Sequence, residues 1–136
     1  MHYLVTGGAG FIGSHIAEAL IKRGDTPVIL DNMYSGRKEN LEANHKAIFI
    51  EGSIMDTALL DEICTKYNIN GIFHLAAVAS VQKSIENPAH VHEINATGTI
   101  NVLEAARKHN IRKVVLSASA AAVSYTHLTL PTMAVV

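Results

Sequence analysis

Three glycines near the N-terminus have the spacing of a diphosphate-binding turn. The segment TGGAGFIG at residues 6–13 follows the pattern G-x-x-G-x-x-G and lies between an aliphatic run and a helical pattern. In that setting we expect Gly7 to permit a tight turn, Gly10 to let the backbone approach a pyrophosphate, and Gly13 to let the next helix pack closely. The helix N-terminus would add unpaired N–H groups and the positive end of its dipole. The alternative is an ordinary glycine-rich turn without a ligand.

An acidic residue ends the second aliphatic run and favours the ligand-binding interpretation. Asp31 lies 18 positions after Gly13, where a carboxylate can accept hydrogen bonds from both ribose hydroxyls of an adenosine. The carboxylate would repel a 2′-phosphate, and no arginine stands at positions 32 or 33, although Arg37 and Lys38 follow. The pattern therefore predicts NAD rather than NADP. The alternative is that Asp31 serves only as a turn residue.

Both features need a sheet that brings the ends of its strands together. Aliphatic runs predict five strands, at residues 2–6, 27–31, 47–51, 71–74 and 113–117, with helical patterns between them. Such runs are typical of parallel strands that are covered on both faces. The order of elements therefore predicts a doubly wound α/β fold with a Rossmann-type parallel sheet. Because that fold commonly has a further strand, we expect the sheet to be truncated after the fifth.

Two of the expected helices show an apolar face. In the first, Ile12, Ile16 and Leu20 recur at intervals of four. The last is long: it is expected to run from the N-cap Asn87 to Lys108. One face of that helix carries Val91, Ile94, Gly98, Val102 and Ala105. Loops are expected at residues 32–40 and between the fourth strand and the long helix.

Composition and charge exclude several classes of function. With 49% hydrophobic and 17% charged residues, the chain has the composition of one globular domain with a core. A net charge of -1 leaves no basic surplus for a phosphate backbone, so no nucleic-acid partner is expected. No apolar run approaches the roughly 20 residues that span a bilayer, so no membrane partner is expected. The lone Cys64, and a first segment that reads as a strand and not as a leader peptide, favour the cytoplasm. The histidines lack the spacing of a metal site, and no metal is expected.

Several segments resemble the NAD-dependent epimerase/dehydratase family of extended short-chain dehydrogenases/reductases, and within it the UDP-glucose 4-epimerase branch most of all. The segments, within residues 1–121, are VTGGAGFIGSH at 5–15, LDN at 30–32, SGR at 35–37, FHLAA at 73–77 and N-x-x-G-T-x-N-V at 95–102. The resemblance implies an NAD-binding Rossmann domain over residues 1–122. It also implies tightly bound NAD, a nucleotide-sugar substrate, with a UDP-sugar favoured, and a homodimer in the intact parent.

The resemblance assigns cofactor contacts to individual residues. It implies that Phe11 and Ile12 lie beside the pyrophosphate, that Asp31 and Asn32 hold the adenosine ribose, that Ile54 flanks the adenine, that Leu75, Ala76 and Ala77 underlie the nicotinamide half, and that Asn95 reaches the cofactor from the long helix. Ser53 departs from the family, which usually has an aspartate there, so we expect weaker selectivity for adenine. For Asn95 an alternative stays open, since its side chain could bridge within the fold. His74 is expected to be a hydrogen-bonding or packing residue rather than a catalyst.

The catalytic half of the family pattern is incomplete in this sequence. Family members use a Ser/Thr, Tyr and Lys set to oxidise a sugar hydroxyl, and the segment VVLSASAA at 114–121 makes Ser119 the substrate-side serine by resemblance. The alternative is that Ser119 bonds its own backbone. Tyr125 is followed four positions later by Thr129, and no lysine occurs after Lys113. Tyr125 is therefore not assigned as the base.

The last segment matches no epimerase pattern. Residues 123–132, VSYTHLTLPT, resemble the translation of a transposase sequencing adapter, so we interpret residues 123–136 as a non-native tail. A natural divergent terminus is the alternative. A sheet that ends at its fifth strand would leave an edge and an apolar face uncovered. We therefore expect the fragment to be inactive, and to aggregate or bind NAD weakly.

Three functions remain open for the intact parent. The first is a UDP-sugar epimerase in which NAD removes hydride from C4 and returns it to the opposite face. The second is a nucleotide-sugar 4,6-dehydratase or decarboxylase of the same family, which downstream residues would distinguish. The third is a non-catalytic NAD-binding regulatory relative, whose gene would lack Tyr-x-x-x-Lys.

Overall fold

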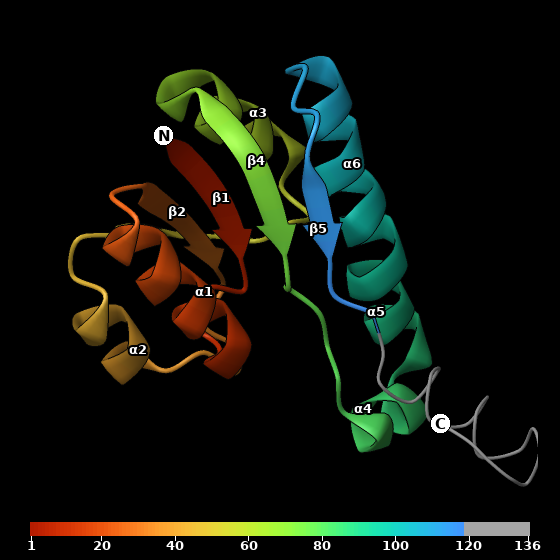
Figure 1. Ribbon diagram of the computed structural model, residues 1–136. Coiled ribbons are helices and arrows are strands. Elements are labelled where there is room, and N and C mark those ends of the chain that lie inside the picture. The colour runs from red at the N-terminus through yellow and green to blue at the C-terminus, as the bar shows by residue number, and fades with distance from the viewer. Residues whose placement is uncertain (119–136) are drawn as a thin grey trace, which may run out of the picture.

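The computed structural model describes residues 1–118, and in that part of the chain five strands form one parallel sheet (Figure 1). The strands are β1 (His2–Thr6), β2 (Thr26–Asp31), β3 (Ile48–Glu51), β4 (Ile69–His74) and β5 (Val114–Leu116). Their order across the sheet is β3-β2-β1-β4-β5. The chain thus moves outward from β1 to β3, then returns to place β4 on the other side of β1. This is the strand order of a doubly wound Rossmann sheet, and it confirms the predicted fold class.

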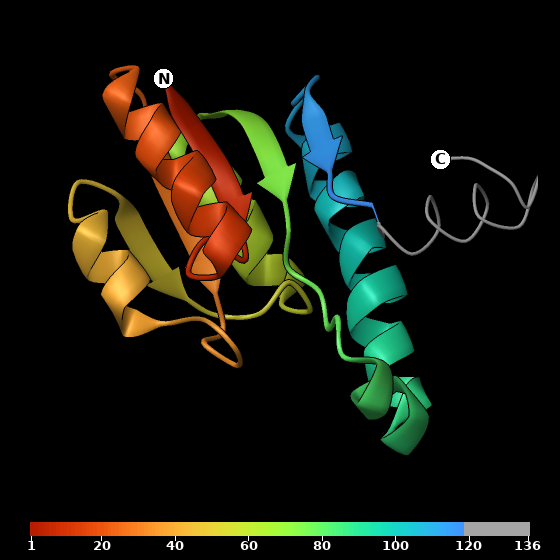
Figure 2. The same cartoon turned by 60° about the horizontal axis from the view of Figure 1, so that its bottom comes forward.

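Helices cover both faces of the sheet. On one face lies α1 (Phe11–Lys22), with α2 (Lys38–Ala43) beside it. On the other face lie α3 (Thr57–Tyr67) and α6 (Gly98–Lys108), as Figure 2 also shows. After β4 come α4 (Val81–Glu86) and α5 (Pro88–His92), and a π-helical turn, η1 (Glu93–Thr97), joins α5 to α6. The main core lies between the sheet and the pair α3 and α6; its buried members include Leu4, Val28, Leu30, Leu60, Ile63, Ile72 and Val102.

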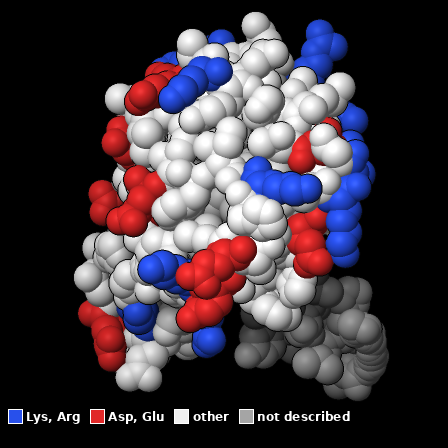
Figure 3. All heavy atoms as spheres, turned by 90° about the vertical axis from the view of Figure 1, so that its left-hand side faces the viewer, with Lys and Arg blue, Asp and Glu red and all other residues white. Residues whose placement is uncertain are grey.

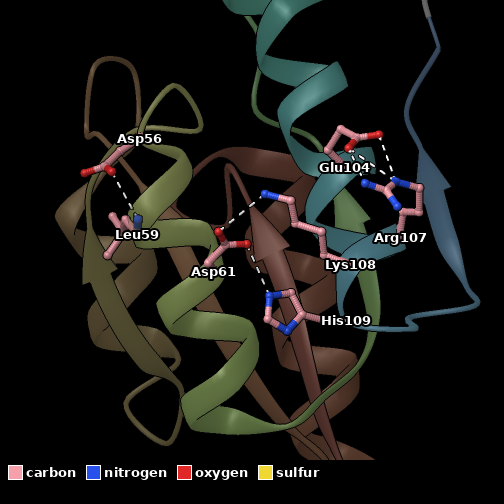
Figure 4. Close-up of polar contacts among 7 residues, drawn as sticks. All are labelled: Asp56, Leu59, Asp61, Glu104, Arg107, Lys108 and His109. Atoms are coloured by element: carbon pink, nitrogen blue, oxygen red, sulfur yellow. Dashed lines mark hydrogen bonds and ion pairs between the residues drawn. The ribbon is translucent and has the colours of Figure 1, made fainter.

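The ends of α3 and α6 are fixed by polar contacts on the surface (Figure 4). Asp56 caps α3, because its carboxylate accepts a hydrogen bond from the Leu59 N–H at 3.0 Å. Within α3, Asp61 lies 3.7 Å from the Lys108 ammonium and 3.2 Å from the His109 Nε2. These contacts join α3 to the C-terminal end of α6, where cations are favoured by the helix dipole.

The two predicted apolar faces have different outcomes. On the long helix the prediction is confirmed, since Val91, Gly98, Val102 and Ala105 are buried and Ile94 is half-buried against the core. On α1 it is confirmed for Leu20, which is buried, but wrong for Ile12, which is 58% exposed, while Ile16 is only half-buried. The buried face of α1 is formed by Gly13, Ser14, Ala17 and Leu20. Small residues on that face let the helix approach the sheet closely, so bulkier Ile12 is turned toward a cavity beside the glycine turn.

Two short helices were expected to be loops. α2 has no buried residue, so no apolar periodicity marks it in the sequence. Ser80 is the N-cap of α4, and its hydroxyl accepts a hydrogen bond from the Lys83 N–H at 3.2 Å. That serine cap was present in the sequence among small residues, but a helix of one and a half turns does not reveal a face.

The edges of the sheet are less covered than the aliphatic runs predict. On the α1 side, one row of side chains runs across the sheet in register through Phe49, Ile29, Val5, Phe73 and Val115. Val5 and Ile29 are fully buried, whereas Phe49 is 38% exposed and Val115 is 56% exposed. The expected burial on both faces therefore holds for the central strands alone, because α1 covers only the middle of this face.

The surface seen in Figure 3 carries basic and acidic side chains interspersed over α1, α2 and their neighbours. In the part of the chain that the structure describes, no helix has the length and apolar character needed to cross a membrane.

Candidate functional site

The glycine turn lies where β1 ends and α1 begins. Gly7 has φ +72°, a left-handed conformation that favours glycine, and an added Cβ would lie 2.9 Å from the Ala76 N atom. A Cβ on Gly13 would lie 2.3 Å from the Gly7 O atom, so the first turn of α1 packs directly on the backbone of the glycine turn. These two glycines therefore have the roles in the fold that their spacing predicts.

Gly10 is the N-cap of α1 and adopts an extended conformation that any residue can take. Within the described chain no side chain caps this helix, so its first N–H groups have no side-chain acceptor. Gly10 also lines both of the cavities described below. The start of α1 is thus open to an anion, which is what a diphosphate requires.

Asp31 holds the glycine turn to the end of β2. It is 8% exposed, and one carboxylate oxygen accepts a hydrogen bond from the Ala9 N–H at 3.0 Å while the other accepts from the Met33 N–H at 2.8 Å. A carboxylate offers about four lone-pair positions, so each oxygen keeps one for a ligand hydroxyl. Asp31 therefore serves the turn, as the alternative interpretation has it, and it also lines the first cavity with Gly7 and Gly10.

The residues expected at the adenosine end line the same cavity. Asn32 follows Asp31, and its side-chain oxygen accepts a hydrogen bond from the Tyr34 N–H at 3.0 Å. The Ser53 hydroxyl accepts from the Met55 N–H at 3.0 Å, and Ile54 is buried at the wall. The Ser53 hydroxyl thus contacts the backbone two residues further along, and the expected weaker selectivity for adenine stays a prediction.

The residues expected at the nicotinamide end form the loop after β4. Leu75, Ala76 and Ala77 line both cavities. Asn95 bridges to this loop: its side-chain oxygen accepts from the Val78 N–H at 2.8 Å, and its amide donates to the Val78 O at 2.9 Å. The structure thus shows the bridging role that was left open for Asn95. Its predicted contact with a cofactor stays a prediction.

Two cavities meet at the glycine turn. The first, of about 270 Å³, is lined by Asp31 among others, and the second, of about 840 Å³, is lined by the exposed Phe11 and Ile12. Six residues line both: Gly7, Gly10, Leu75, Ala76, Ala77 and Val78. Both cavities lie at the carboxyl ends of the strands, where the strand order reverses between β1 and β4. A ligand with two halves joined by a diphosphate fits this arrangement, with the diphosphate at the shared residues.

Several residues that shape the site carried no signal in the sequence reasoning. The Thr6 hydroxyl accepts from the Leu75 and Ala76 N–H groups, each at 3.1 Å. Asn40 donates from its side chain to the Ala9 O atom at 2.7 Å and so anchors the loop after β2 to the glycine turn. Both contacts join segments far apart in the sequence. Thr6 was quoted only as part of the family pattern at residues 5–15, and the SGR segment at residues 35–37, in the loop after β2, was quoted only in the same way.

Some predicted features lie outside the described residues. Ser119 and the segment interpreted as a non-native tail lie beyond residue 118. Within residues 1–118, no three His, Cys, Asp or Glu side chains are grouped as metal ligands.

Comparison with known proteins agrees with this geometry. The model of the NAD dependent epimerase/dehydratase family matches residues 3–131. A putative UDP-glucose 4-epimerase of Methanocaldococcus jannaschii is 46% identical over 120 residues, which cover 88% of this chain and 38% of that protein.

Solved structures show the same likeness. The UDP-glucose 4-epimerase of Thermotoga maritima, solved with UDP-glucose, has a TM-score of 0.84 at 41% identity and is matched over 88% of this chain and 38% of its own. That of Brucella ovis, in complex with NAD, has a TM-score of 0.81 at 40% identity, over 88% of this chain and 36% of its own. The chain therefore spans somewhat more than a third of the length of these relatives. Because the family match covers nearly the whole sequence, the chain belongs to the NAD dependent epimerase/dehydratase family.

Proposed function

We propose that this chain is the NAD-binding part of a nucleotide-sugar epimerase of the UDP-glucose 4-epimerase type. The observation that carries the proposal is the pair of cavities that meet at the glycine turn, with Asp31 in the wall of one of them. The relatives named above as UDP-glucose 4-epimerases support the reaction. Residues 1–122 would form the cofactor-binding domain of the longer protein.

The two cavities divide the proposed contacts between the halves of the cofactor. Asp31 and Asn32 would hold the adenosine ribose, and Ser53 and Ile54 would border the adenine. The glycine turn, with Phe11 and Ile12 beside it, would hold the diphosphate. Leu75, Ala76 and Ala77 would underlie the nicotinamide ring, with Asn95 behind them. NAD when bound supplies a hydride acceptor for the sugar C4, and the residues of this chain bind and orient it.

The proposed reaction needs residues beyond the cofactor site. Ser119 is proposed as the serine that contacts the sugar hydroxyl, and a tyrosine with a lysine four positions later would supply the base. No lysine follows Lys113 in this sequence. We therefore propose that the chain, where it stays folded, binds NAD weakly without turning over a nucleotide sugar, and that the 123–136 segment takes no part.

The partners of the longer protein are proposals of the same kind. A UDP-sugar is the favoured substrate. A homodimer is supported by Ile100 and Leu103, which are 58% and 44% exposed on α6 although both are apolar. The free thiol of Cys64 in the core is compatible with the cytoplasm. A dehydratase, a decarboxylase or a non-catalytic NAD-binding relative would share the cofactor site and differ after it.

The experiment that tests the proposal is a calorimetric titration of the folded chain with NAD and NADP. NAD should bind more tightly, because Asp31 would repel a 2′-phosphate. Asp31→Asn should weaken NAD binding about tenfold or more, since a ligand hydroxyl loses a charged acceptor. Asp61→Asn on α3 is the matched control and should leave NAD binding unchanged.

The outcomes separate cofactor binding from the reaction. A folded wild-type chain that gives no binding signal with NAD would refute the proposed site. Turnover of UDP-galactose by the chain as it stands would refute the proposed division of labour. A gene that encodes Tyr-x-x-x-Lys after Ser119 would support the epimerase, whereas a gene without that motif would favour the non-catalytic relative.

A further inference from the structure

His74 is the last residue of β4. The side chain is 4% exposed, and both ring nitrogens have hydrogen-bond partners. Nδ1 lies 2.6 Å from the Thr6 Oγ1 atom, at the end of β1. Nε2 lies 2.9 Å from the Thr99 Oγ1 atom, at the start of α6. The imidazole thus links two segments that border the larger cavity.

The neighbouring hydrogen bonds define which ring nitrogen carries the proton. The Thr6 hydroxyl oxygen already accepts from the Leu75 and Ala76 N–H groups, so its own hydrogen is free to point at Nδ1. Nδ1 must then be the acceptor, and the ring proton lies on Nε2. Nε2–H donates to the Thr99 oxygen, and the Thr99 hydroxyl donates to the Asn95 O atom at 2.7 Å. In this series of hydrogen bonds every donor points in the same direction, from the loop after β4 toward the π-helical turn.

The network closes on the loop it started from. Asn95 lies in η1, and its side chain binds both the N–H and the C=O of Val78. The loop of residues 75–78 is therefore held at one end by Thr6 and at the other by Asn95, with His74 and Thr99 between the two anchors. A π-helical turn inside a longer helix is often found at functional sites. Here it aims the Asn95 side chain at the loop.

We propose that His74 is a positioning residue for the loop of residues 75–78: as the neutral imidazole with its proton on Nε2, it couples the end of β1 to the π-helical turn that carries Asn95. The importance of this loop for the cofactor rests on the proposed function, whereas the coupling itself does not. Burial lowers the pKa of His74, which agrees with the neutral form. A second proton on Nδ1 would face a Thr6 oxygen whose lone pairs are in use.

The test removes one link at a time. Thr99→Val keeps the shape of the side chain and removes the acceptor for Nε2–H, whereas Thr99→Ser retains the hydroxyl. Thr97→Val is the matched control, because Thr97 is exposed and lies in the same π-helical turn. Amide hydrogen exchange of Val78 reports the Asn95 anchor, and that of Ala76 reports the Thr6 anchor. Thr99→Val should speed exchange at Val78 about tenfold and weaken NAD binding by a similar factor, and both control variants should resemble the wild type.

A second variant and a spectroscopic measurement keep the proposal falsifiable if Thr99→Val fails to fold. His74→Asn places an amide near the Nδ1 position but cannot reach Thr99, so it should speed exchange at Val78 more than at Ala76. Nitrogen-15 NMR of the wild-type ring should show an unprotonated Nδ1. Unchanged exchange at Val78 in the folded variants, or a protonated Nδ1 at neutral pH, would overturn the proposal. If exchange responds as expected while the wild type does not bind NAD, the proposed function fails and the role of His74 stands.

Discussion

Gly13→Ala provides the sharpest test of how the glycine turn is built. Gly13 is the third residue of α1, and an ideal Cβ there would lie 2.3 Å from the Gly7 O atom and 2.8 Å from the Gly8 Cα atom. Contacts under 3.0 Å are essentially never seen for a real Cβ, so the helix start has to move away from the turn. Both neighbours are backbone atoms, and no side-chain rotation relieves the contact.

The magnitude follows from two opposing effects. Replacing a glycine by alanine inside a helix would by itself stabilise the helix by up to about 1 kcal/mol. Overpacking against fixed atoms costs about 1–3 kcal/mol. We therefore expect a net loss of about 1–2 kcal/mol of unfolding free energy, which for a chain of this size lowers Tm by about 4–8 °C.

Gly10→Ala is the comparison variant. Gly10 has φ -79° and ψ 178°, which alanine adopts readily, and its Cβ would meet only the Gly7 O atom, at 3.2 Å. Thermal unfolding followed by circular dichroism should therefore show a smaller loss of Tm than for Gly13→Ala. Gly10 lines both cavities, so Gly10→Ala should weaken NAD binding more than its small effect on Tm suggests. The ratio of lost affinity to lost Tm should therefore be larger for Gly10→Ala than for Gly13→Ala. A Gly13→Ala chain that is as stable as the wild type would refute the reasoning.

Three further predictions concern the core and the helix ends. Burial lowers the pKa of His74 from 6.5, so the imidazole of the unfolded chain takes up a proton at higher pH than that of the folded chain. The difference in unfolding free energy between the wild type and His74→Asn should therefore be constant above pH 6.5 and shrink as the pH falls below it. Urea unfolding at a series of pH values measures this difference. Burial, with a contribution from Asp61, raises the pKa of the Cys64 thiol to about 11, so only about a thousandth of the thiol is ionised at pH 8. Ellman's reagent should therefore react rapidly with Cys64 only after unfolding, and fast labelling of the native chain would contradict this. Asp56→Ala should cost about 1 kcal/mol through loss of the α3 cap, whereas Asp61→Asn, whose ion pairs are exposed, should cost less than about 1 kcal/mol; equal losses of urea midpoint would count against the cap.

Much of the fold and the centre of the site were predictable from local patterns. The alternation of aliphatic runs with helical segments indicated a doubly wound parallel sheet, because such runs are typical of strands that are covered on both faces. The spacing of Gly7, Gly10 and Gly13, and the place of Asp31 at a strand end, indicated the crevice at the carboxyl ends of the strands. Glycine at close backbone contacts is a local requirement, so it is visible without knowledge of distant partners.

The errors arose where a residue's environment depends on distant segments. Ile12 was assigned to the buried face of α1 from periodicity alone, yet it is exposed beside the larger cavity, since the close contact of Gly13 with the glycine turn sets the rotation of the helix. α2 and α4 were missed because helices of six residues bury too little to show a face.

The hydrogen-bond network around His74 is the clearest product of tertiary structure. Thr6 and His74 are 68 positions apart, and His74 and Thr99 are 25 positions apart. They meet because the sheet order sets β4 beside β1 and because the helix after β4 returns over the sheet. The sequence by itself determined the kind of fold and the place of the glycine turn, through periodicity and glycine spacing. Which polar side chains pair behind that turn was decided only when the strands came together, because a hydrogen bond depends on distance in space and not along the chain.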